Sequence, residues 1–70
     1  METIELNNQI KVKRAIKNIT QEELAAQIGV TRKTINTIET GKFIPSTILA
    51  IKLARFFKIN VEELFILVEK

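Results

Sequence analysis

Apolar residues recur at helical spacing in the middle of the chain. Leu24 and Ile28 are one helical turn apart, and Ile35 and Ile38 follow with the i, i+3 spacing of a second helix face. Gly29 lies between the two stretches, where its access to positive φ values can end the first helix. This pattern predicts two short helices that each bury one face and are joined by a tight turn.

Polar side chains occupy the outward positions of the second of these helices. Thr31 can cap its start. The face that follows carries cationic, amide and hydroxyl groups: Arg32, Lys33, Thr34, Asn36 and Thr37. A helix that is apolar on one side and rich in hydrogen-bond donors on the other suits the major groove of DNA. We therefore interpret residues 21–40 as a DNA-binding helix-turn-helix.

Three further helices are predicted around this pair. Asn7 or Asn8 can cap a first helix that runs to about Lys17, with Ile10 and Ala15 among its inward residues.

The last two helices follow the helix-turn-helix. Ser46 begins a strongly apolar fourth helix that ends at about Lys58, and Asn60 with Glu63 caps a fifth. We therefore predict an all-α bundle of five helices, in which residues 1–70 form one domain.

The composition excludes several kinds of site. The 70 residues include no cysteine and no histidine, so the chain has no disulfide, no thiolate metal site and no histidine base. Eight scattered carboxylates and no phosphate-binding glycine loop leave no convergent catalytic set. We expect no enzyme activity, cofactor or metal, and without a second domain we expect no small-molecule effector site.

The charge distribution and the hydropathy of the chain indicate what it binds and where it is located. Residues 11–58 contain ten Lys or Arg and three Glu, a local balance of +7, whereas residues 1–10 and 59–70 each carry −2. This distribution suggests one face for phosphate and another region kept away from it, although lysines that only aid solubility are the alternative. No apolar run reaches membrane-span length and METIELNN lacks a signal-peptide pattern, so we expect a soluble cytoplasmic protein.

Taken together, the motifs resemble the phage repressor/Cro (Xre-type) family of transcriptional regulators. The resemblance runs from about Ile10 to Phe65 and includes the ITQEELA opening, the GVTRKTI turn, the IETGK exit and a downstream PST before an apolar helix. It implies sequence-specific binding of double-stranded DNA by a small regulator, and we expect a repressor. The alternative is an interaction module with a protein partner, such as an antitoxin or a transcription co-regulator.

The resemblance also implies roles on the second helix of the motif. Arg32 and Lys33 lie in its first turn, where the family reaches base edges. Thr34 can meet a phosphate or a thymine methyl, and Thr37 lies on the same face as Lys33. Asn36 either pairs with adenine or reaches only the DNA backbone.

Phosphate contacts are implied on both flanks of that helix. Gln21 begins the first helix of the motif, where the family uses a glutamine to meet phosphate and to brace the recognition helix. Thr40, Lys42 and the Gly41–Lys42 backbone follow the second helix, and are expected to hold phosphate there.

Arg14 and Glu39 match a family ion pair that orients the recognition helix without touching bases. Lys13 departs from the family, which often has a leucine there, and Val12 is apolar where a charge is common. Either the first helix is rotated slightly, or Lys13 lays its stem over the core and extends its ammonium outward.

The two ends of the chain have strand-like patterns. Residues 3–6 alternate polar and apolar side chains, and Phe65, Ile66, Leu67 and Val68 favour β structure. Some small members of the family add a β-ribbon, which implies that these segments pair, whereas the alternative is a frayed N-terminus and a longer final helix. The same four apolar residues predict a homodimer that presents two recognition helices to successive major grooves of an inverted repeat.

Overall fold

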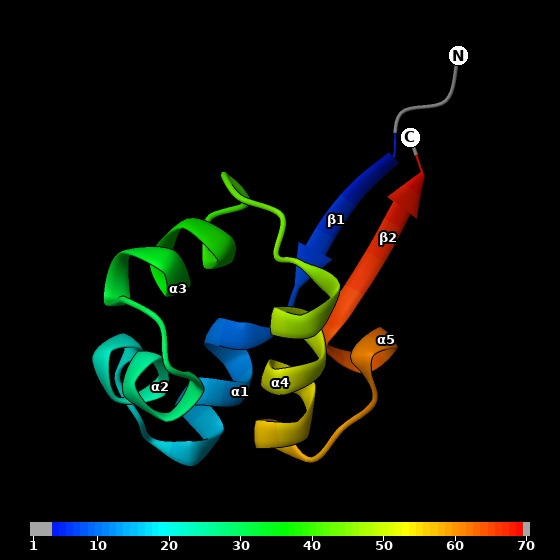
Figure 1. Cartoon of the computed structure of the whole chain (residues 1–70). Helices are drawn as coiled ribbons and strands as arrows, with labels where there is room; N and C mark the ends of the chain where they lie inside the picture. The colour runs from blue at the N-terminus through cyan, green and yellow to red at the C-terminus, as the bar shows by residue number, and fades with distance from the viewer. Residues whose placement is uncertain (1–3, 70) are drawn as a thin grey trace.

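The computed structural model describes residues 4–69 and contains five helices and two strands in that range (Figure 1). In chain order these elements are β1 (Ile4–Asn8), α1 (Ile10–Lys17), α2 (Gln21–Ile28), α3 (Arg32–Glu39), α4 (Thr47–Phe57), α5 (Val61–Leu64) and β2 (Phe65–Glu69). The predicted five-helix fold is confirmed. The described helices are too short or too polar to cross a lipid bilayer.

Local capping chemistry sets the bounds of the helix-turn-helix. Thr20 accepts a hydrogen bond from the Glu23 backbone N–H at 3.0 Å, and the Glu23 carboxylate accepts one from the Thr20 N–H, so the two residues form a capping box at the start of α2. Gly29 ends α2 with a φ of +85°, a conformation that favours glycine. Thr31 then caps α3 through its hydroxyl oxygen.

Helix α1 begins differently from the prediction. Its N-cap is Gln9, because Asn8 is the last residue of β1, although the Asn8 side-chain oxygen still accepts a hydrogen bond from the Ile10 N–H at 3.2 Å. Ile10 is buried as expected, but Ala15 is exposed and its predicted inward position is wrong. Lys13 is half-buried and Val12 is 50% exposed, so the helix is not rotated to bury Val12.

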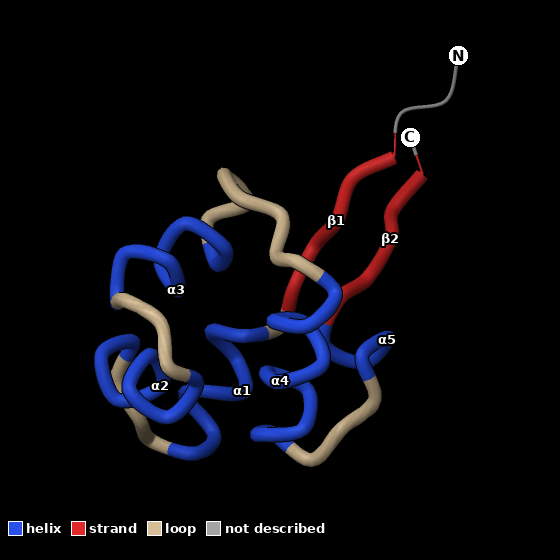
Figure 2. Tube along the Cα trace, viewed as in Figure 1, coloured by secondary structure: helices blue, strands red, loops and turns tan. Residues whose placement is uncertain are grey.

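The two strands pair in antiparallel fashion, with Leu6 opposite Leu67 and Asn8 opposite Phe65. Helix α5 therefore ends at Leu64, and the alternative of a longer final helix is wrong. Figure 2 shows that the strand structure is confined to this ribbon, which projects from the helical body. The two described ends of the chain lie side by side at its tip (Figure 1).

One apolar core joins all the elements. Its fully buried side chains are Ile10, Leu24, Ile35, Ile38, Leu53 and Leu64, with Phe57 and Phe65 at 8% and 7% exposure. Within residues 4–69 no polar or charged residue is fully buried. The helix-turn-helix is therefore held by burial of its inner face, and its polar outer face remains in solvent.

Candidate nucleic-acid interface

Helix α3 presents the polar face that its sequence pattern predicts. Ile35 and Ile38 are almost completely buried behind it, whereas Arg32, Lys33 and Asn36 are exposed. These three side chains line one shallow hollow on the outer surface. Thr34 and Thr37 are half-buried at the edge of this face.

An ion pair ties α3 to α1. The Arg14 guanidinium donates from Nε and Nη2 to the two carboxylate oxygens of Glu39, at 2.7 and 3.1 Å, and from Nη1 to the Ile19 carbonyl at 3.0 Å. The side chains retain 15% and 5% exposure, respectively. The hydrogen bond to Glu39 raises the pKa of Arg14, an effect that partial burial opposes and charge attraction reinforces. The arginine therefore stays charged at neutral pH.

Gln21 extends this pair into a network that reaches the outer face of α3. Its side-chain Nε2 donates to Asn36 Oδ1 at 3.1 Å and to Glu39 Oε1 at 3.2 Å. Asn36 therefore lies on the flank of α3 that faces α2. Its amide oxygen already accepts one hydrogen bond, so its NH₂ group is the part best placed to meet DNA.

The threonines of α3 direct their hydroxyl groups back to the helix. Thr37 Oγ1 donates to the backbone carbonyls of Lys33 and Thr34, both at 3.0 Å, and Thr40 Oγ1 donates to the Asn36 carbonyl at 2.9 Å. Phosphate oxygens only accept hydrogen bonds, so either hydroxyl would have to leave its carbonyl to reach a phosphate.

The turn after α3 folds back on the helix. The backbone N–H of Gly41 donates to the Ile38 carbonyl at 3.1 Å, and the N–H of Lys42 donates to the Thr37 carbonyl at 2.9 Å. These N–H groups, from which we expected a phosphate clamp, are thus occupied within the protein. The exposed Lys42 ammonium is the group that this turn offers to a phosphate.

The start of α2 and Arg32 of α3 border the same hollow. Gln21, Arg14 and Arg32 line a hollow of about 480 Å³ on this flank, together with Glu22. The first N–H groups of a helix and the Arg32 guanidinium favour an anion there. The Glu22 carboxylate opposes it, and Glu39 already balances the charge of Arg14.

Three features were missed by the sequence analysis. Asn8 Nδ2 donates to the Ile38 carbonyl at 2.9 Å and so links β1 to the end of α3. Phe43 is 49% exposed beside Lys33 and Lys42. Of these two features only the exposed Phe43 has a sequence signal, which is that an aromatic residue directly follows a predicted phosphate-binding lysine.

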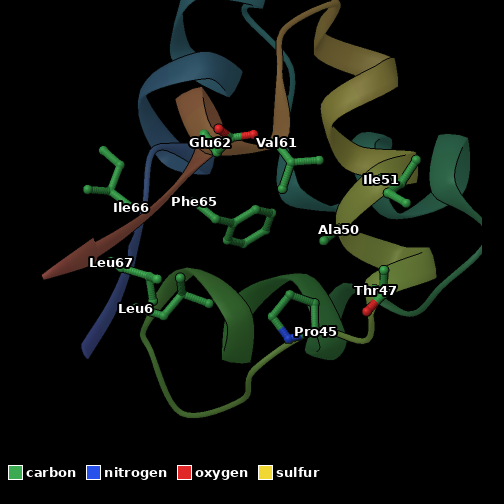
Figure 3. Close-up of a pocket in the computed structure, with 10 residues that line it drawn as sticks. All are labelled: Leu6, Pro45, Thr47, Ala50, Ile51, Val61, Glu62, Phe65, Ile66 and Leu67. Atoms are coloured by element: carbon green, nitrogen blue, oxygen red, sulfur yellow. The ribbon is translucent and has the colours of Figure 1, made fainter. Parts of the chain in front are cut away.

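The third missed feature is an apolar groove of about 610 Å³ between the ribbon, α4 and α5. It is lined by Leu6, Pro45, Thr47, Ala50, Ile51, Val61, Glu62, Phe65, Ile66 and Leu67. Figure 3 shows the Phe65 ring in the middle, between Leu6 and Leu67 of the ribbon and the residues of α4.

Residues 4–69 contain no cluster of three or more acidic side chains that could hold a metal ion.

Two helices joined by a glycine turn, with a buried apolar back and an exposed polar front, define a helix-turn-helix DNA-binding protein. The family model for helix-turn-helix proteins matches residues 10–64. The chain therefore belongs to the repressor/Cro-type helix-turn-helix family, whose members bind double-stranded DNA and regulate transcription, and it is not an enzyme.

Individual relatives agree with this assignment. An uncharacterized HTH-type transcriptional regulator of Methanocaldococcus jannaschii is 49% identical over 61 residues, which cover 87% of this chain and 92% of that protein. The HTH-type transcriptional activator BcrR of Enterococcus faecalis is 36% identical over 61 residues, which cover 87% of this chain and 30% of BcrR. The crystal structure of the restriction-modification controller protein C.AhdI from Aeromonas hydrophila superposes with a TM-score of 0.72 at 29% identity, covering 79% of this chain and 80% of that one.

Proposed function

We propose that this transcriptional regulator is a homodimeric repressor that reads an inverted-repeat operator through the major groove. The observation that carries the proposal is the exposed face of α3, which the Arg14–Glu39–Gln21 network fixes relative to α1 and α2. A recognition helix held in this way loses little conformational freedom on binding. A dimer that covers its operator represses by excluding the polymerase.

The roles within the site follow from position and chemistry. Arg32 and Lys33 donate to base edges, and arginine offers a planar fork that matches guanine O6 and N7. Lys42 contacts phosphate on one flank of α3. On the other flank the backbone N–H of Gln21 contacts phosphate, since its side-chain amide already donates to Asn36 and Glu39. Thr34 and Thr37 meet the DNA mainly through their methyl carbons, and Thr40 reaches a phosphate only if its hydroxyl leaves the Asn36 carbonyl.

The dimer is proposed to form through the ribbon and the apolar groove. A two-fold interface requires one surface to carry both a hollow and the groups that fill it. Leu67 is 70% exposed and Ile66 is 40% exposed at the margin of the groove (Figure 3). Phe65 is part of the core and offers little surface, so of the four predicted interface residues Ile66 and Leu67, with half-buried Val68, carry this proposal.

Selection of bound duplexes from random-sequence DNA tests the proposal. We expect a symmetric site whose affinity falls steeply with salt, because several cations displace counterions from the phosphates. Failure to enrich any duplex, together with recovery of one stoichiometric protein partner, would instead support the interaction-module alternative. A reporter gene placed behind the selected site separates repression from the activation for which BcrR is named.

A further inference from the structure

A small hollow lies between the base-reading face of α3 and the turn that follows it. Its volume is about 260 Å³, and it is lined by Lys33, Thr34, Thr37, Lys42 and Phe43. Phe43 is 49% exposed, and it shares the hollow with two lysines. An exposed aromatic ring in such surroundings is typical of a binding surface.

Backbone hydrogen bonds fix the main chain of Phe43 relative to the recognition helix. The N–H groups of Lys42 and Phe43 both donate to the Thr37 carbonyl, at 2.9 and 3.1 Å. The backbone of Phe43 therefore moves with α3, and its ring stays within reach of a ligand read by α3.

The walls of the hollow are more apolar than their residue types suggest. The Thr37 hydroxyl donates to helix carbonyls, and the Thr34 hydroxyl lies 3.0 Å from the Thr31 hydroxyl. Without a change of rotamer, these threonines offer a ligand mainly their methyl carbons. The hollow thus combines apolar walls with the side chains of two lysines.

We infer that Phe43 packs against the C–H surface of one nucleotide, a deoxyribose or a thymine 5-methyl, whose phosphate pairs with Lys42. A nucleotide is the unit of DNA that joins an anionic group to such an apolar surface. The hollow lies between the side chains proposed to read bases and the lysine proposed to hold phosphate, where a nucleotide links the two. The inference rests on the proposed DNA binding and adds an uncharged contact to it.

The test compares the Phe43→Ala protein with the wild type on a duplex that carries the site selected by the wild type. We expect a loss of affinity of about five- to tenfold, the effect of removing a partly buried apolar contact. The salt dependence should be unchanged, because a phenyl ring releases no counterion. Phe43→Leu should retain part of the affinity, and it remains informative if Phe43→Ala fails to fold.

The matched control is Val12→Ala, since Val12 is 50% exposed on α1 and does not line the hollow. Replacing single thymines by uracil then identifies the partner group. If a uracil replacement weakens binding by the wild type but not by Phe43→Ala, the partner group is the thymine methyl. If Phe43→Ala loses affinity but no uracil replacement weakens binding by the wild type, the partner group is the deoxyribose.

Two results would overturn the inference while leaving the proposed function intact. One is equal affinity of the wild type, Phe43→Ala and Val12→Ala for the selected duplex. The other is a loss on Phe43→Ala that is matched by a reduced salt slope, which would mean that a phosphate contact had been disturbed. If the wild type selected no duplex at all, the proposed function would fail and the inference with it.

Discussion

The Glu39 carboxylate receives three hydrogen bonds from two different helices. Arg14 of α1 contributes two of them, and Gln21 of α2 contributes the third. Because Glu39 is the last residue of α3, its anchoring fixes the end of the recognition helix opposite to the Thr31 cap. We infer that the geometry of the DNA-reading face depends on side chains that never touch a base.

Replacing Arg14 with methionine tests this dependence. The change leaves the nearly buried Glu39 carboxylate without its cation, so the free energy of unfolding should fall by about 3 kcal/mol, near the low end for a broken buried pair. Urea unfolding measures the loss. Lys11→Met removes an exposed cation from the same helix and should cost almost nothing. Equal costs for the two variants would show that the ion pair does not stabilise the fold.

Arg32 and Lys42 should separate base reading from phosphate binding. Arg32→Ala should cost about 1–3 kcal/mol on the selected site and relax the preference at one or two base pairs. Lys42→Ala should weaken binding to all sequences similarly and lower the salt slope by about one. Both effects are measured by titrating specific and random duplexes at several salt concentrations. If Arg32→Ala weakened both duplexes equally, Arg32 would be a phosphate contact.

Among the elements, the helices were the most predictable from sequence. Their boundaries depend on residues that act locally, such as the Thr20–Glu23 capping box, Gly29 in the turn and Asn18 at the left-handed end of α1, where φ is 56°. Ala15 was misplaced because its small side chain fits an inner or an outer position, and α1 fully buries only Ile10. A local pattern therefore determines where a helix ends better than which side it buries.

The ribbon is the element on which assembly is proposed to depend. Leu67→Asp should convert dimers to monomers, because it places a carboxylate at the margin of the apolar groove. Its effect on the fold itself should be small, since Leu67 is 70% exposed in the single chain. Light scattering at tens of micromolar measures the change. Val12→Asp, at an exposed position of α1, is the control that should leave the assembly unchanged.

On the scale of the whole molecule, the ribbon projects from the helical body on the side away from α2 (Figure 1). A two-fold dimer that binds DNA needs one surface for the DNA and a second surface for its partner subunit. The contacts that join these parts were not predictable. The Asn8 bond to the Ile38 carbonyl joins residues 30 positions apart, and the position of Phe43 depends on how its turn folds back on α3. The first contact has no local sequence signature, and the sequence marks Phe43 only as an aromatic residue next to a predicted phosphate-binding lysine.

The operator sequence should have the same two-fold symmetry as the proposed dimer. We expect an inverted repeat with half-site centres about 10–10.5 base pairs apart, or one further turn, each with a guanine read by Arg32 or Lys33. Inserting five base pairs between the half-sites rotates one of them to the opposite side of the duplex and should abolish dimer binding, which gel-shift titration measures. Unchanged affinity after the insertion, or an asymmetric selected site, would contradict the two-fold model.

The antiparallel ribbon also determines how the molecule responds to tension. Ile4 and Glu69 form the outermost pair of the ribbon, and the open ends of both strands lie beside each other there (Figure 1). A pulling force on these ends acts across the strands, along the interstrand hydrogen bonds. It loads them one pair after another, from Ile4–Glu69 inward to Asn8–Phe65. Weak tension would thus peel the ribbon apart stepwise while the helix-turn-helix remained folded.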